Sequence, residues 1–143
     1  MSKNNKVIGS FGEKIACLYL ENKNHKILIK NFKCKFGEID LITNYNNNLF
    51  FIEVKTRHNI NFGLPFESVN SAKLKKIKKI SQCFLLRNNY FLQNDINLRY
   101  CVVSIIIYKE LMDAILIAKE NNPINLKNIQ EGIDYKIKML EIS

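Results

Sequence analysis

The sequence is poor in the two residues that most often interrupt regular structure, with five glycines and two prolines among 143 residues. The glycines are scattered, so the chain lacks a phosphate-cradling loop of the P-loop or dinucleotide-binding type. No internal repeat and no linker divides the chain, and its length is usual for one domain. We therefore expect residues 1–143 to form a single domain.

Cysteine is also sparse, and its copies are far apart in the sequence. They form no Cys-x-x-Cys pair, and their spacing fits neither a zinc site nor a dense disulfide scaffold. We expect free thiols, mostly buried, in a reducing cytosol. The four positions are Cys17, Cys34, Cys83 and Cys101.

Long apolar runs are missing, although 47% of the residues are hydrophobic, which is ample for one core. The longest run lies near residues 100–108, far short of the ~20 residues that span a bilayer. The first 14 residues contain no continuous apolar segment of the secretory type. The sequence therefore predicts a cytoplasmic protein without a membrane partner.

Acidic residues are outnumbered, because 22 lysines and arginines stand against 13 aspartates and glutamates, for a net charge of +9. Such a surplus attracts polyanions, and nucleic acid is the commonest polyanion of the cytoplasm. The chain is also rich in Asn, Lys and Ile, so compositional drift explains the lysines equally well. Charge alone leaves both interpretations open.

Hydrophobic periodicity predicts two helices, at residues 9–22 and 71–87. Alternating or β-branched segments predict four strands, at residues 25–32, 36–43, 49–56 and 97–109. Beyond residue 109 the pattern weakens and indicates a strand over 112–118 and a short helix over 124–133. The order of elements predicts an α/β sheet with helices packed on it.

The segment from residue 36 to residue 56 has the pattern of a β-hairpin, because an Asn-rich stretch joins two apolar runs. Opposed residues of a hairpin have position numbers with a constant sum. An odd sum puts the apolar side chains on one buried face and gathers the charged ones on the other, whereas an even sum would bury charges. A sum of 93, for instance, pairs Leu41 with Ile52, Asp40 with Glu53, and Glu38 with Lys55.

Clustered carboxylates raise one another's pKa unless a cation joins them. Lys55 offsets one charge, and a divalent ion offsets more; oxygen ligands suit Mg²⁺ or Mn²⁺. Such an ion lowers the pKa of a bound water and stabilises charge on a phosphate, while Lys55 can orient or deprotonate that water. These residues therefore suit phosphodiester hydrolysis, and an ordinary solvated strand face is the alternative.

Two strings of this hairpin, GEID at residues 37–40 and FIEVKTR at residues 51–57, resemble the YraN family of small bacterial proteins. The resemblance extends over about residues 9–103 and leaves the tail, residues 109–143, unassigned. That family is similar to the PD-(D/E)XK nucleases and to archaeal Holliday-junction resolvases. The resemblance implies a restriction-endonuclease-like fold, with a mixed sheet and an antiparallel site hairpin flanked by helices.

The resemblance also implies roles for individual residues. Asp40 and Glu53 would bind Mg²⁺ or Mn²⁺, and Lys55 would assist the attacking water. Glu13 matches a further acid on the first helix. Ser10 and Glu13 also fit a capping box, in which the glutamate returns a hydrogen bond to the cap residue. Both accounts of Glu13 can hold at once.

One position departs from the family pattern. The strand after the basic helix usually reads Arg-Phe-Asp-Val in this family, and here it reads Arg-Tyr-Cys-Val over residues 99–102. The thiol of Cys101 cannot replace a carboxylate as a ligand of a hard metal or as a salt-bridge partner.

The helix at residues 71–87 carries lysines that suit sequence-independent phosphate contacts, Lys73 and Lys76 among them. Arg57 lies two residues after Lys55 and can grip a phosphate near the site. The resemblance implies a metal-dependent endonuclease acting on branched or structured DNA, working as a homodimer. The alternatives are a non-catalytic nucleic-acid-binding module and a protein–protein adaptor that docks through the tail.

A few other side chains give weaker signals. His25 and His58 are expected at the surface. Three aromatic residues in expected loops could stack on unpaired bases or anchor the loops; they are Tyr45, Phe62 and Phe66.

Overall fold

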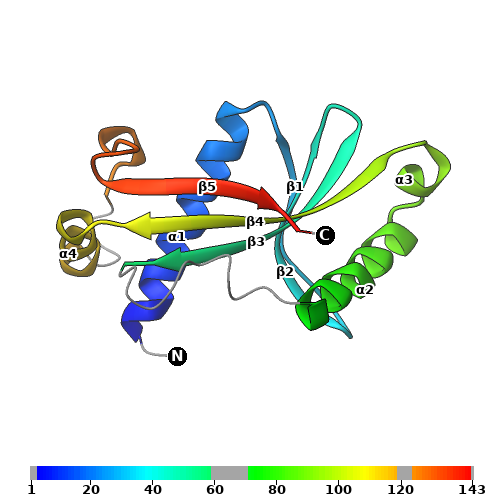
Figure 1. Ribbon diagram of the computed structural model, residues 1–143, viewed down its shortest axis with the longest axis horizontal. Helices are drawn as coiled ribbons and strands as arrows, with labels where there is room; N and C mark the ends of the chain where they lie inside the picture. The colour runs from blue at the N-terminus through cyan, green and yellow to red at the C-terminus, as the bar shows by residue number, and fades with distance from the viewer. Residues whose placement is uncertain (1–2, 59–70, 119–123, 143) are drawn as a thin grey trace.

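The structure is a computed structural model, and it describes residues 3–58, 71–118 and 124–142. A five-stranded sheet has the order β1-β2-β3-β4-β5 (Figure 1). Its strands are β1 (Lys26–Cys34), β2 (Gly37–Tyr45), β3 (Asn48–Arg57), β4 (Asn97–Ile107) and β5 (Tyr135–Glu141). The helices are α1 (Lys3–Asn22), α2 (Ser71–Arg87), α3 (Asn89–Gln93) and α4 (Lys109–Ala118), with a 3₁₀ turn at Leu126–Asn128.

The sheet is mixed, because β3 and β4 run parallel while the other neighbouring strands run antiparallel. The parallel pair is joined through α2 and α3, as a parallel connection requires a crossover. This arrangement confirms the predicted α/β class and the mixed sheet with an antiparallel hairpin flanked by helices.

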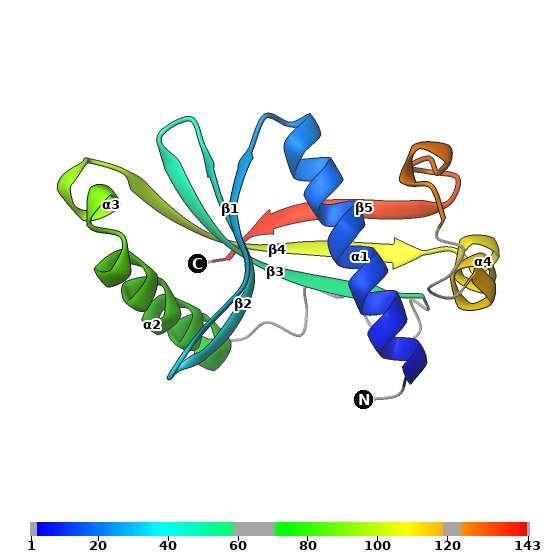
Figure 2. The same ribbon diagram turned by 180° about the vertical axis from the view of Figure 1, so that it is seen from behind.

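Helices cover both faces of the sheet. Figure 2 shows α1 crossing one face, and one core cluster joins α1 and α4 to alternate residues of β4, including Val103 and Ile105. The second cluster lies under α2 and contains Ile42 and Phe51, both fully buried. These two residues share strand parity with Asp40 and Glu53, so the prediction of a single apolar face on the hairpin is wrong.

The predicted odd sum is confirmed, since the paired residues from Tyr45–Asn48 to Leu41–Ile52 all have position numbers that sum to 93. The turn consists of Asn46 and Asn47 alone, with φ angles of 51° and 62°. Asparagine tolerates this left-handed conformation, which two-residue hairpin turns of the I′ type need at both positions.

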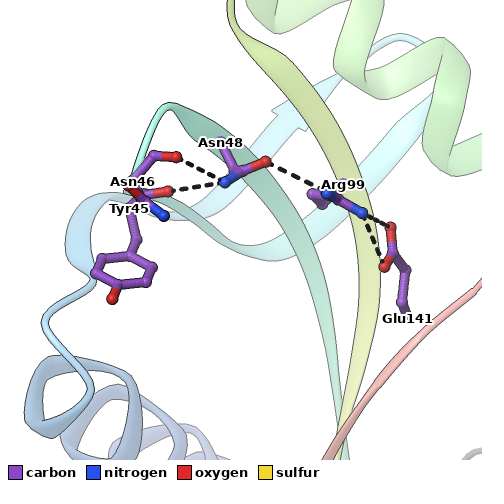
Figure 3. Close-up of polar contacts among 5 residues, drawn as sticks. All are labelled: Tyr45, Asn46, Asn48, Arg99 and Glu141. Carbon is purple, nitrogen blue, oxygen red and sulfur yellow. Dashed lines mark hydrogen bonds and ion pairs between the residues drawn. The ribbon is translucent and has the colours of Figure 1, made fainter.

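A series of polar side-chain contacts connects the turn end of the hairpin to β4 and β5 (Figure 3). The amide of Asn48 donates to the carbonyl oxygens of Tyr45 (3.3 Å) and Asn46 (2.8 Å). Arg99 on β4 donates from Nε to Asn48 Oδ1 at 3.2 Å and pairs with Glu141 on β5 at 3.1 Å. The strands β3, β4 and β5 are thereby tied together by side chains.

Two element predictions in the tail are wrong. Residues 112–118, expected as a strand, belong to α4, whose buried residues Leu111, Met112 and Ile115 recur at helical spacing. Residues 124–133, expected as a short helix, contain only a 3₁₀ turn. The strand β5 was not predicted at all, although Ile137 and its neighbours alternate in burial as strand residues do.

All four cysteines are free, as expected, and two of them, Cys17 and Cys101, are buried. Cys34 on β1 and Cys83 on α2 are half-buried, and their thiols interact. Burial and this interaction raise the pKa of Cys83. None of the helices in the described part of the chain is long and apolar enough to cross a bilayer.

Candidate active site

The site lies where β2 and β3 separate. Their pairing ends at Leu41–Ile52, and β2 continues beside β1 alone while β3 continues beside β4. Figure 1 shows β2 turning away from β3 toward α2. The backbone N–H of Val54 then donates to Asp40 Oδ2 at 2.7 Å, in place of a bond to the neighbouring strand.

The predicted opposition of Asp40 to Glu53 and of Glu38 to Lys55 is therefore absent from the described ladder of β2 and β3, which stops one pair earlier. The side chains nevertheless interact. Glu53, Glu13 and Lys55 all act on the charge of Asp40, so charged groups from β2, β3 and α1 lie close enough to influence one another.

Asp40 is the most perturbed carboxyl group of this site. Burial raises its pKa from the ordinary 3.8 to about 7, and the negative charges of Glu53 and Glu13 act in the same direction. The Val54 N–H and Lys55 oppose the rise but do not cancel it. A carboxyl group in this state is poised between its two protonation forms near neutral pH and gains from any cation placed beside it.

Glu53 is held by two ammonium groups. Its Oε1 lies 3.3 Å from Lys55 Nζ and 3.5 Å from Lys73 Nζ. Lys73 comes from the first turn of α2, and burial followed by the neighbouring Lys55 lowers its pKa. The structure thus places Lys73, predicted as a phosphate contact on the helix surface, directly in the carboxylate site.

The sequence does contain a signal for this placement of Lys73. It stands four residues before Ile77, and residues four apart lie on the same side of a helix. Since Ile77 is buried against the sheet, Lys73 faces the sheet as well.

Glu13 reaches the site from α1. Burial and the charges of Glu38 and Glu53 raise its pKa, while Lys30 lowers it. Because α1 begins at Lys3, Ser10 lies inside the helix, and the prediction of a capping box is wrong. Glu13 therefore sits in mid-helix, half-buried and beside other carboxylates.

The other two predicted nucleic-acid contacts border the carboxylates. Arg57 ends β3, is half-buried, and donates from Nη1 to the Thr56 carbonyl oxygen at 3.1 Å. Lys76 is exposed, and its side chain packs over Gly37 at the start of β2. Lys76 therefore lies at the β1–β2 turn, whereas Lys73 forms an ion pair with Glu53.

Cys101 lies in the core, where the strand residues Ile52 and Glu141 flank it in the ladder. Burial raises the pKa of its thiol to about 12, and the charged groups that act on it are Glu141 and Arg99. The departure from the family pattern at this position therefore falls beside the Arg99–Glu141 pair, and the hairpin residues Asp40, Glu53 and Lys55 remain together.

The expectation that both histidines lie at the surface is half wrong. His58 is exposed, but His25 is buried, with Nδ1 2.8 Å from Thr43 Oγ1 and its ring stacked on Tyr45 at 5.0 Å. Tyr45 ends β2 rather than lying in a loop. Phe62 and Phe66 fall outside the described residues.

The donor set limits what kind of metal could bind. Among residues 3–58, 71–118 and 124–142, the His, Cys, Asp and Glu side chains form no group of three or more arranged to hold an ion. Mg²⁺, however, commonly takes only one or two carboxylates and completes its shell with water and phosphate. Asp40 and Glu53 fit this mode of binding, and they do not fit a closed cage of protein ligands.

The fold and the site together define a small mixed α/β protein with a carboxylate–lysine site at the divergence of two strands. The family model described as "Uncharacterised protein family UPF0102" matches residues 12–105, which include Glu13, Asp40, Glu53 and Lys55. The chain belongs to this family, also called the YraN family. The helix α4 and the strand β5 of this chain lie beyond the matched segment.

Relatives of the same family support the assignment. A UPF0102 protein of Caldanaerobacter subterraneus subsp. tengcongensis is 56% identical over 87 residues, covering 61% of this chain and 71% of that protein. One of Clostridium novyi is 47% identical over 105 residues, covering 73% and 85% respectively. One of Clostridioides difficile is 41% identical over 113 residues, covering 79% and 96%.

Proposed function

We propose that this chain is a metal-dependent endonuclease of the PD-(D/E)XK class that hydrolyses phosphodiester bonds in branched or otherwise structured DNA. The observation that carries the proposal is the convergence of Asp40 and Glu53 at the separation of β2 and β3, with Lys55 Nζ 3.3 Å from Glu53. The net charge of +9 supports a polyanionic substrate.

Asp40 and Glu53 would hold Mg²⁺ or Mn²⁺, and Glu13 adds a third negative charge from α1. The ion, when bound, lowers the pKa of a water and neutralises charge on the phosphate. Lys55 is held beside Glu53, where its ammonium group can orient the water or stabilise the charge that develops at phosphorus. Arg57, at the end of the same strand, would hold a neighbouring phosphate.

The test is cleavage of labelled junction, flap, single-stranded and duplex DNA in Mg²⁺ by the purified protein. Asp40→Ala and Lys55→Ala should each lower the rate by at least about a hundredfold, the usual scale for a charge-stabilising or acid–base group. Asp113→Ala and Lys109→Ala alter exposed residues of α4 and serve as matched controls. Cleavage that persists unchanged in Asp40→Ala would sink the proposal.

The second candidate is a non-catalytic nucleic-acid-binding module that keeps its carboxylates for folding. It is favoured by the two ammonium groups that already neutralise Glu53 Oε1, one from β3 and one from α2. Calorimetric titration separates the two functions. No heat with Mg²⁺ or Mn²⁺, together with salt-sensitive DNA binding, would favour the module.

The third function, an adaptor that docks through the apolar tail, is less favoured because much of the tail's apolar surface is buried. Leu111 and Ile115 of α4 and Ile137 of β5 are buried in the core formed with α1. Ile117 and Ile133 of the tail are exposed, at 77% and 69%, so an adaptor would have to dock through these two side chains and not through a continuous apolar face.

We also propose that the protein acts as a homodimer in the cytoplasm. Resolvases of this class pair to cut two strands, and the four free thiols fit a reducing compartment. Sedimentation of the purified protein with and without junction DNA tests the dimer. A single monomeric species under both conditions would exclude it.

A further inference from the structure

A phenylalanine projects from the turn between β1 and β2. The ring of Phe36 is 38% exposed and, in the described part of the chain, belongs to neither core cluster. Lys35 Nζ lies 5.1 Å from its centroid, and Lys79 Nζ of α2 lies 5.7 Å from it. Figure 1 shows this turn beside α2. The ring is thus held at the surface between ammonium groups from two elements.

Two of the elements around this ring, β1 and α2, contain several basic residues and no acidic ones, while β2 carries one exposed acid, Glu38, two residues after Phe36. Neither β1 nor α2 includes an aspartate or glutamate. Arg87, near the other end of this surface, donates to the Lys33 carbonyl oxygen at 3.4 Å and stacks over Phe32 at 5.3 Å. Such a surface concentrates phosphate groups along its length.

The surface leads into the carboxylate site. Lys76 packs over Gly37, where a Cβ would come within 2.5 Å of the lysine Cε. Asp40 follows Phe36 by four strand positions, at most about 13 Å at 3.3 Å per residue. That length corresponds to roughly four nucleotides of one stacked strand.

We propose that Phe36, Lys35 and Lys79 form a subsite for an unpaired nucleotide, with the base on the Phe36 ring and the adjoining phosphates on the two lysines. The subsite rests on the proposed function and specifies which part of the substrate the protein grips, namely a segment of unpaired strand. A base inside a duplex already has stacking partners on both sides, so an exposed ring at a turn selects a base that lacks them.

Binding requires the Phe36 ring to exchange an ammonium group for a base, and the strengths of the two interactions favour this exchange. Stacking one base on an aromatic side chain changes affinity by roughly 5- to 150-fold. An exposed lysine–ring contact is worth about 2- to 5-fold. A base that displaces one ammonium group from the ring therefore gains more than the ring loses, and the released lysine is free to contact phosphate.

The experiment measures fluorescence anisotropy of two labelled DNAs, one fully paired and one with a ten-nucleotide overhang, in EDTA to prevent cleavage. Phe36→Leu keeps an apolar side chain and removes the aromatic face, and Phe36→Trp keeps the face. Tyr108→Leu is the control, because Tyr108 is also 38% exposed and follows β4, whose end lies beside α4 and away from α2 and the β1–β2 turn (Figure 1).

We expect Phe36→Leu to bind the overhang DNA about tenfold more weakly and the paired DNA within twofold of the wild type. Phe36→Trp and Tyr108→Leu should bind both as the wild type does. If the wild type binds the overhang DNA and Phe36→Leu binds it equally well, the subsite is overturned while the proposed function stands. Absence of binding to either DNA at ~50 mM salt overturns the proposed function and the subsite together.

A second readout places 2-aminopurine in the overhang, because its fluorescence responds to stacking. The wild type and Phe36→Trp should change that fluorescence, and Phe36→Leu should not. An equal change in all three would mean that the base stacks elsewhere, and it would overturn the subsite even if affinity fell.

Discussion

The backbone N–H of Val54 donates to Asp40 Oδ2 at 2.7 Å, across the point where β2 and β3 cease to pair. This bond favours the ionised form of Asp40, yet burial and two neighbouring acids still raise the pKa of that carboxyl group to about 7. The folded chain therefore holds the Asp40 proton more tightly than the unfolded chain, whose Asp40 titrates near 3.8.

Asp40→Asn should make the metal-free protein more stable at alkaline pH. The wild type loses stability as pH rises from about 4 through 7, because Asp40 must ionise against its surroundings, whereas asparagine stays neutral and can still accept the Val54 bond. The stability advantage of the variant over the wild type should grow by about 2–4 kcal/mol between pH 4 and pH 8. The upper limit corresponds to the full rise of the Asp40 pKa, about three pH units.

Urea unfolding of both proteins in EDTA across this pH range measures the effect. Asp113→Asn, at an exposed position of α4, should follow the wild-type curve at every pH. Parallel curves for Asp40→Asn and wild type would show that Asp40 titrates normally in the folded protein.

Divalent ions should stabilise the wild type through the same carboxylates. At 10 mM Mg²⁺ and a dissociation constant of about 1 mM, binding adds about 1.4 kcal/mol, which raises Tm by about 4 °C. Asp40→Asn and Glu53→Gln should remove the shift, whereas Asp113→Asn should keep it. Thermal melts at constant ionic strength test this, and an equal shift in all four proteins would assign it to non-specific salt effects.

The contact between α1 and β3 should be sensitive to one methyl group. A Cβ on Gly12 would lie 2.8 Å from Thr56 Cγ2 and 2.9 Å from Thr56 Cβ, and closer still to Oγ1, whereas Gly9 has no heavy atom within 4 Å of such a Cβ. Gly9→Ala should stabilise the helix by about 1 kcal/mol. Gly12→Ala should be about 1–3 kcal/mol less stable than Gly9→Ala, because the clash forces the elements apart.

Denaturant midpoints compare the two alanine variants directly. Adding Thr56→Ala to Gly12→Ala removes the clashing atoms and should recover part of the loss. If Gly12→Ala were as stable as Gly9→Ala, the close approach of α1 to β3, which brings Glu13 to the site, would be refuted.

Acidification should destabilise the protein through His25. Burial and the nearby Lys23 lower the pKa of this histidine, so the unfolded chain binds a proton that the folded chain resists. Stability from His25 is therefore present above pH 6.5 and is lost as pH falls below it. His25→Gln keeps a partner for Thr43 and should flatten this loss, while His58→Gln, at the exposed histidine, should leave it unchanged.

The comparison uses unfolding free energies at pH 7.5 and pH 5.5, taken as differences from the wild type so that the opposite trend of Asp40 cancels. His25→Gln should also lose about 1 kcal/mol at pH 7.5, since the ring contacts with Tyr45 and Phe50 disappear. Identical pH dependence in the two glutamine variants would contradict the assignment.

The pairing of the hairpin was predictable because it follows from local patterns. Alternation of apolar and polar residues identified the two strands, and the asparagines identified the turn, so an odd sum of paired positions followed, which the pairing of Leu41 with Ile52 satisfies. The tail was not predictable in the same way. The apolar residues of α4 and β5 are mostly isoleucine, leucine and methionine in short segments, and such short runs suit a helix or a strand equally well.

The sequence by itself singled out Asp40, Glu53 and Lys55 as candidate site residues and determined the parity of their strands, since both follow from residue order along single elements. Tertiary structure decided the rest. It placed Lys73 on Glu53, Cys34 against Cys83, and His25 in the interior, because each contact joins residues from different elements. It also ended the β2–β3 ladder just before Asp40, because β2 bends toward α2 while β3 continues beside β4, and no local pattern encodes where two strands part.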